Sequence, residues 1–118
     1  MGTSQQQVSD FLNKFKALVT QRRFHFVQRL ATNKIALSLG LTETIAKQEL
    51  LNLSVIDFSS GPIQDRDIPS QDFWIFGKEI NGCEVYIKLK IYTVNGDEYA
   101  KCVSFHEAEF TMKYPFQR

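Results

Sequence analysis

The sequence predicts an α+β domain in which an antiparallel sheet of about four or more strands packs against two to three N-terminal helices. Residues 73–107 read as three successive strands, because Asn81-Gly82 and Asn95-Gly96 separate runs of alternating apolar and polar residues. Asn-Gly is the strongest short-range hairpin signal, since both residues tolerate the positive φ of tight turns. Residues 8–20 carry apolar side chains at spacings of three and four, which indicates an amphipathic helix ahead of the sheet.

The middle strand, residues 83–94, defines the two faces of the predicted sheet, because side chains alternate faces along a strand. One face would be core and carry Cys83, Val85, Ile87, Leu89 and Ile91. The other would carry Glu84, Tyr86, Lys88, Lys90 and Tyr92. The alternation therefore predicts a basic, aromatic face, although periodicity alone is explained more simply by an ordinary solvated face.

The third strand, residues 99–107, can adopt either of two registers. A three-residue loop at residues 94–96, with Gly96 in a bulge, places Val103 and Phe105 in the core. The face of Tyr86 then also receives Ala100, Cys102, Ser104 and His106. A two- or four-residue loop would instead put His106 in the core. We expect the first register, because Val and Phe are better core residues than Ser and His.

The N-terminal half supplies shorter elements. Residues 21–30 read as a short strand with Phe24, Phe26 and Leu30 on one side and His25 on the other. Residues 32–39 are predicted to form a short helix closed by Gly40, and Thr42 would cap a second helix over residues 43–52. A further turn is expected to start at Ser54-x-x-Asp57.

Residues 59–72 are predicted to be a loop, because Gly61-Pro62 and Pro69 interrupt regular structure. A surface connection is the commoner role of so long a loop, although a mobile lid is an alternative. The tail, residues 108–118, is rich in aromatic side chains and should be docked. Lys113 and Arg118 would then lie at the rim of the basic face.

Composition indicates one domain spanning residues 1–118, with 43% hydrophobic and 23% charged residues. No apolar run approaches the roughly 20 residues of a membrane span, and the N-terminus lacks the apolar segment of a signal peptide. We therefore expect a cytosolic protein without membrane contact. Cys83 and Cys102 are placed on opposite faces, which argues against a disulfide. The scattered Cys and His residues give no metal-ligand spacing, so no metal or cofactor is expected.

A net charge of +1 does not by itself indicate a nucleic-acid binder. The distribution is uneven, however. Residues 14–34 hold six positive side chains and no acid, whereas residues 43–72 hold six acids against Lys47 and Arg66. One end of the molecule would then attract a polyanion that the other repels, although an uneven solvated surface explains the pattern as well.

Several segments, in this order and spacing, resemble the MqsR family of bacterial toxins. These are Leu53-Ser54-x-x-Asp57-Phe58, Gly61-Pro62, Phe73-Trp74-x-Phe76-Gly77-Lys78, Val85-Tyr86-Ile87-Lys88 and Val103-Ser104-Phe105-His106. The resemblance covers about residues 8–116 and implies a RelE-like fold. It also implies a metal-independent endoribonuclease, an mRNA interferase that acts as the toxin of a type II toxin-antitoxin system. The implied partners are mRNA and a cognate antitoxin.

The resemblance transfers one catalytic position directly, which is Tyr86. Where the family uses a lysine in the last strand motif, a lysine after the LSxxDF motif and a glutamine after the sheet tryptophan, this chain has His106, Ser60 and Ile75. Metal-free RNA cleavage needs a base, an acid and cations around the phosphate. We expect His106 to be the acid or base, because imidazole titrates near neutral pH.

The remaining site residues follow from their place on the basic face. Tyr86 would be a second acid–base group or a phosphate ligand, and Lys88 would hold the phosphate. Lys90, Lys78, Tyr92 and Lys113 are expected to bind substrate, with Tyr92 stacking an RNA base. Lys78 is ambiguous, because a two-residue hairpin pairs it with Val85 on the apolar side unless a bulge at Gly77 releases it. Glu107 would point to the opposite face.

Two other classes remain open. A non-catalytic module could dock RNA or a protein on the same face, and its RNA binding would depend steeply on salt. An interaction domain with a merely solvated face would show no such binding.

Overall fold

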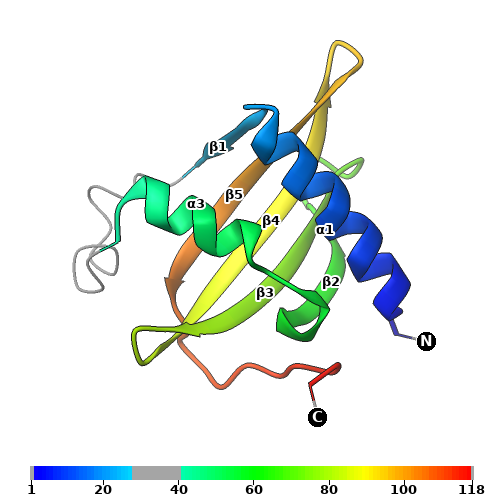
Figure 1. Ribbon diagram of the computed structural model, residues 1–118. Coiled ribbons are helices and arrows are strands. Elements are labelled where there is room, and N and C mark those ends of the chain that lie inside the picture. Colours follow the sequence, from blue (N-terminus) through cyan, green and yellow to red (C-terminus); the bar gives the residue numbers. More distant parts are fainter. Residues whose placement is uncertain (1, 28–40, 118) are drawn as a thin grey trace.

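The computed structural model describes residues 2–27 and 41–117. Five strands form one sheet in the order β1-β5-β4-β3-β2, and two helices cover one of its faces (Figure 1). The elements are α1 (Gln5–Thr20), β1 (Phe24–Phe26), α3 (Glu43–Leu51), the 3-10 turn η2 (Val55–Asp57), β2 (Phe58–Gln64), β3 (Asp72–Ile80), β4 (Cys83–Val94) and β5 (Asp97–Glu107). β1 runs parallel to β5, and all other neighbours are antiparallel. The predicted α+β architecture is confirmed.

The N-terminal elements form largely where the sequence places them. α1 begins earlier than predicted because Ser4 caps it, accepting from the Gln7 N–H at 3.1 Å. Its buried face is Val8, Phe11, Leu12, Phe15, Leu18 and Val19. α3 is capped by Thr42 as predicted, and the turn after Ser54 is η2. β1 begins three residues later than the predicted strand, at Phe24, and the last three residues of that prediction, 28–30, lie outside the described residues. The predicted helix over residues 32–39 lies outside the described residues.

The β3–β4 hairpin matches the sequence prediction closely. Ile80 pairs with Cys83 across Asn81 and Gly82, whose φ values are 51° and 84°. Val85, Ile87 and Leu89 of β4 are fully buried against the helices. Tyr86 and Lys88 lie on the opposite face, which is hereafter called the outer face. The alternation along β4 is therefore confirmed.

β5 places His106 on the predicted face, but its register with β4 differs from the predicted one. The β4–β5 turn has two residues, since Val94 pairs with Asp97. The extra residue is instead Val103, which bulges between the pairs Leu89–Cys102 and Lys88–Ser104. Ala100 and Cys102 are therefore buried in the core and not on the outer face, which corrects the predicted register of this half. Beyond the bulge Phe105 enters the core and His106 faces outward, as predicted.

Residues 58–64 form a strand, so the prediction of a loop over residues 59–72 was wrong for its first half. β2 is an edge strand, and its pairing with β3 shifts register on either side of Ser60. Edge strands and bulges tolerate a proline without an N–H, which is why Gly61-Pro62 does not end β2. The loop is confined to residues 65–71.

The two cysteines lie on the same face of the sheet, and not on opposite faces as predicted. Cys83 pairs with Ile80 at one end of β4, whereas Cys102 pairs with Leu89 near its middle. Six residues of strand, about 20 Å, separate these positions, which is far beyond disulfide reach. Both thiols are free.

The C-terminal tail is docked, as the sequence predicts. An added Cβ at Gly77 would lie 2.6 Å from the Tyr114 hydroxyl and 2.7 Å from the Met112 sulfur, so the tail rests on this glycine. Phe116 then stacks on Phe58, with ring centroids 5.6 Å apart. Within residues 2–27 and 41–117, no helix is long and apolar enough to cross a membrane.

Candidate functional site

Tyr86 and His106 are directly opposite each other on β4 and β5. Their rings stack with centroids 5.0 Å apart and an interplanar angle of 18°. The bulge at Val103 makes this possible, because a regular ladder from the two-residue turn would turn His106 into the core. The two groups that the sequence analysis placed at the catalytic centre are therefore brought together.

A surface cavity of about 260 Å³ opens over this pair, lined by Tyr86, Ser104, His106, Glu109 and Phe110. Nδ1 of His106 lies 2.9 Å from the carbonyl oxygen of Glu107. A carbonyl can only accept, so Nδ1 carries the proton and donates it. In the neutral ring this leaves Nε2 as the nitrogen that can take up a proton.

Partial burial raises the pKa of Tyr86 above its ordinary value. Its hydroxyl therefore stays protonated at neutral pH and acts as a hydrogen-bond donor, not as a base. A protonated phenol can donate a hydrogen bond to an anionic oxygen.

Lys88 lies two positions along β4 from Tyr86 and pairs with Ser104. Its ammonium sits 4.0 Å from the centroid of the Phe73 ring, a cation–π contact on the side of Lys90, and Lys88 does not line the cavity. Among the described ion pairs none involves Lys88, so its charge is available to an anion.

Lys90 does not join this site, in contrast to its predicted role in binding substrate. Its ammonium is 2.6 Å from the Asp65 carboxylate, and the side chain is only 2% exposed. Asp65 begins the loop at residues 65–71 and lies against Lys90 of β4. Nothing in the sequence indicated that this loop would pack on β4. Lys90 is a structural residue here.

Lys78 is also directed elsewhere. It pairs with Val85, so it lies on the helix side, and its ammonium is 3.0 Å from the Glu49 carboxylate. Gly77 pairs regularly with Tyr86, and the bulge that would have released Lys78 does not form. Glu107 pairs with Val85 and leaves the outer face as predicted. Lys113 is exposed in the docked tail.

Tyr92 belongs to a second group on the outer face, about 20 Å along β4 from Tyr86. Its hydroxyl is 3.3 Å from Nδ1 of His25, and the Lys101 ammonium lies 4.6 Å from its ring centroid. Tyr99 stacks on Tyr92, and Arg23 lies over Tyr99. Burial, followed by the charge of Lys90, lowers the pKa of Lys101. His25 thus lies on the same face as His106, at the other end.

Sequence reasoning missed Glu109 and Phe110. The Ala108 N–H donates to the Glu84 carbonyl at 2.9 Å, and this turns the chain back over the outer face beside Tyr86. Phe110 is 65% exposed and meets the Tyr86 ring edge-on, with centroids 6.5 Å apart. The only feature of the sequence that could have indicated these two site residues was a carboxylate followed by an aromatic side chain, Glu109-Phe110, just after the last strand.

No family model, no curated protein and no solved structure matches this chain. Among residues 2–27 and 41–117, no group of three or more His, Cys, Asp or Glu side chains is arranged to hold a metal ion. The site must therefore be interpreted from its own chemistry.

Proposed function

We propose that this protein is a metal-independent endoribonuclease that cleaves single-stranded mRNA at the Tyr86–His106 cavity. The observation that carries the proposal is the stacked Tyr86–His106 pair in one cavity with Glu109, with Lys88 two positions along β4 from Tyr86. These are an imidazole, a carboxylate, a phenol and a cation, which together supply a base, an acid and anion stabilisation.

The proposed reaction is an internal transesterification. One of the pair His106 and Glu109 removes the proton of the ribose 2′-hydroxyl, whose oxygen then attacks phosphorus. The bond from phosphorus to the 5′-oxygen breaks, and the other group protonates that leaving oxygen. The products are a 2′,3′-cyclic phosphate and a 5′-hydroxyl, with no net change in protons.

The remaining residues hold the phosphate and the bases. The Tyr86 hydroxyl donates to a non-bridging oxygen, and Lys88 offsets the charge that grows on the phosphorane. Phe110 is an exposed ring at the cavity edge on which a base can stack. The group around Tyr92 and Lys101 continues the same face and would hold nucleotides further along the strand.

In cells we propose a toxin of a type II toxin-antitoxin system, acting on mRNA in the cytosol and neutralised by a cognate antitoxin. The support is the sequence resemblance described above, together with an α+β architecture of the class that the resemblance implies. Induced expression should arrest growth, and coexpression of a small neighbouring antitoxin gene should rescue it. Continued growth at a confirmed protein level would argue against the toxin role.

The enzymatic proposal is tested with labelled single-stranded RNA in the presence of excess EDTA. We expect His106→Ala, Glu109→Gln and Tyr86→Phe each to lower the cleavage rate at least tenfold, since positioned acid–base groups typically contribute roughly 10²–10⁴-fold. Mass spectrometry should identify the cyclic phosphate, and an all-deoxy strand should stay intact.

His25→Ala is the matched control, because His25 lies on the same outer face but outside the cavity. It should leave the single-turnover rate at saturating RNA within about twofold, since it contacts Tyr92 in the proposed RNA-binding group and not Tyr86. Full activity of both His106→Ala and Tyr86→Phe would refute the assignment.

A binding module without catalysis is the second candidate. It is favoured by Lys88 and Lys101, whose ammonium groups already lie over aromatic rings, an arrangement suited to stacking and backbone contact. Salt-sensitive RNA binding with no cleavage product in any buffer would support it over the nuclease.

A further inference from the structure

The outer face differs between the two sides of the Tyr86–His106 cavity. On one side the C-terminal tail covers the sheet, because Tyr114 and Met112 rest on Gly77. Glu84 holds both tail residues, accepting from the Tyr114 hydroxyl at 2.8 Å and from the Met112 N–H at 3.3 Å. An RNA strand that left the cavity in this direction would meet the docked tail and a carboxylate.

On the other side of the cavity, basic and neutral side chains follow β4 and β5. The polar outer-face residues of these strands between Tyr86 and Tyr92 are Lys88, Lys90, Ser104 and Lys101. The Asp65 carboxylate reaches this stretch, but it is bonded to Lys90 at 2.6 Å. Ser104 and Lys101 are both partly exposed. A polyanion can therefore follow β5 in this direction without meeting an unpaired carboxylate from the described part of the two strands.

Two tyrosines and two cations stand at the far end of this path, and we call Tyr92, Tyr99, Lys101 and Arg23 the distal anchor. The two tyrosine rings stack with centroids 5.8 Å apart. The Lys101 ammonium lies 4.6 Å from one ring centroid, and the Arg23 guanidinium lies 5.9 Å from the other. Arg23 is 43% exposed, and Asp97 is 3.9 Å away, at the limit of an ion pair. Because the rings already hold both cations in place, less side-chain freedom is lost when a phosphate binds.

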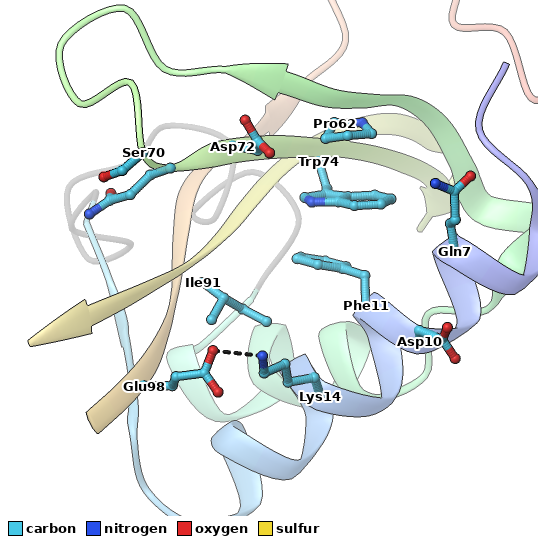
Figure 2. A pocket seen from close by; sticks show the side chains of 11 residues that line it. Gln7, Asp10, Phe11, Lys14, Pro62, Ser70, Asp72, Trp74, Ile91 and Glu98 are labelled. Carbon is cyan, nitrogen blue, oxygen red and sulfur yellow. Dashed lines mark ion pairs between the residues drawn. The ribbon is translucent and has the colours of Figure 1, made fainter. Parts of the chain in front are cut away.

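The helix side of the sheet offers no comparable path. Its largest described pocket has a volume of about 460 Å³, and Figure 2 shows Trp74 and Phe11 there with Lys14 and Glu98 below them. Lys14 is the only cation among the described residues that line this pocket, and its ammonium is paired with Glu98 at 2.6 Å. Contact with a polyanion is therefore expected on the outer face.

We infer that the RNA strand extends from the cavity in one direction only, along β4 and β5, and that Lys101 and Arg23 of the distal anchor hold its phosphates. This inference rests on the proposed nuclease function. Tyr86 and Tyr92 lie about 20 Å apart along β4. A single strand rises about 3.4 Å per nucleotide while its bases stay stacked, so at most about six nucleotides cover this distance. The substrate is accordingly a single strand that reaches about six nucleotides to one side of the scissile phosphate, and a dinucleotide is a poor substrate.

The binding test does not depend on cleavage, because 2′-O-methyl RNA lacks the attacking hydroxyl. Fluorescence anisotropy gives the Kd of labelled 2′-O-methyl strands of three, six, nine and twelve nucleotides. Affinity should rise at least about tenfold from three to nine nucleotides and less than about threefold from nine to twelve, since the longer strand passes the anchor. An even rise over all four lengths would overturn the inference.

Charge-removing variants test the anchor itself. Arg23→Ala and Lys101→Ala should each weaken binding of the nine-nucleotide strand about tenfold, the loss expected for one charge-assisted contact. Lys47→Ala is the matched control, because it removes the same charge from α3 on the helix side, and it should change Kd less than about twofold. Circular dichroism confirms that all three variants fold. Unchanged binding by both anchor variants would refute the anchor. A hexaglutamate peptide that displaced the strand as well as unlabelled RNA would also overturn the inference, since an acidic protein would then fit equally well.

Cleavage tests the single direction. The cleavage site is first mapped in a long RNA, and two nine-nucleotide RNAs then place that site two nucleotides from the 5′ end or two nucleotides from the 3′ end. At subsaturating RNA, one of them should be cut nearly as fast as the long RNA and the other at least about tenfold more slowly. Equal rates would refute the one-sided path and leave the nuclease assignment intact. If no RNA is cut, the nuclease assignment fails, and the binding series still decides whether the anchor exists.

Discussion

The Lys90–Asp65 pair shows that the sequence predicted the position of Lys90 on the sheet correctly but its role wrongly. The β4 alternation places Lys90 on the outer face, and it is there. The buried hydrogen bond from its ammonium to Asp65 Oδ2 then ties it to the loop. Asp65 also accepts from the Asp67 N–H at 2.8 Å, so the same carboxylate shapes the loop turn.

We predict that Asp65→Asn lowers the thermal melting temperature, because it leaves the buried Lys90 ammonium without a counter-charge. Breaking one partner of a buried pair costs more than replacing both by apolar groups. The double variant Asp65→Asn with Lys90→Met should therefore recover part of the loss. Thermal denaturation followed by circular dichroism measures all three proteins. A single variant as stable as wild type would contradict this account.

The same pair predicts a pH dependence. The hydrogen bond from Lys90 is the main cause that lowers the pKa of Asp65 in the folded protein. A carboxyl with a lowered folded pKa stabilises the fold above its unfolded pKa, about 3.9, and loses that contribution as pH falls through the folded value. The difference in melting temperature between wild type and Asp65→Asn should therefore shrink below about pH 4.

At the scale of elements, the bulge at Val103 and the path of the tail create the cavity. The β3–β4 turn, the β4 faces and the α1 face follow from local patterns, and the sequence predicted them. The bulge does not follow from a local pattern, because no glycine marks it and Val103 suits a regular strand as well. The need for one extra residue was recognised, but it was assigned to Gly96. Likewise, Gly61-Pro62 resembles a loop unless its place at the sheet edge is known.

Gly77→Ala should destabilise the docked tail. An alanine in a strand interior is normally favoured over glycine, but here its Cβ would meet the Tyr114 hydroxyl and the Met112 sulfur at less than 3 Å. Overpacking of this kind costs about 1–3 kcal/mol. Tyr114 also donates to Glu84 at 2.8 Å, so its displacement loses a partly buried hydrogen bond. Limited proteolysis should cut residues 108–117 faster.

Tyr114→Phe provides the control for this prediction. Alone it removes the hydrogen bond to Glu84, but combined with Gly77→Ala it also removes the closest clashing atom. The double variant should therefore be less destabilised than the sum of the two single variants. Strict additivity in urea unfolding would show that the tail does not rest on Gly77.

At the scale of the whole molecule, the net charge of +1 does not show how the charged side chains are distributed. On the outer face Lys88, Lys101 and Arg23 each lie over an aromatic ring. Of the positive segment noted in the sequence, Lys14 pairs with Glu98 and Lys16 donates to the Leu53 carbonyl on the helix side, whereas Arg23 lies on the outer face. The segment is therefore divided between the two faces, which the sequence could not show without the sheet topology.

These three outer-face cations predict a modest salt dependence of RNA binding. Three outer-face cations correspond to a slope of about −2 in log K against log salt, from about −0.7 per neutralised phosphate of a single strand. Lys101→Ala should reduce the slope by about 0.7 and leave the single-turnover cleavage rate at saturation unchanged. Lys47→Ala, on α3, is the control and should change neither. Fluorescence anisotropy would give the slope of log K against log salt from 50 to 300 mM salt, about a sixfold range of concentration.

The interrupted edge strand β2 has a consequence for behaviour at high concentration. The unpaired N–H and C=O groups of an edge strand can pair with a strand of another chain and so start aggregation. Proline and bulges in the edge strand hinder this pairing. Pro62 offers no amide hydrogen, and the register shifts around Ser60 break the even spacing that a visiting strand would need. Fibril growth should therefore not begin at this side of the sheet, which helps the protein stay dispersed when it is produced in quantity.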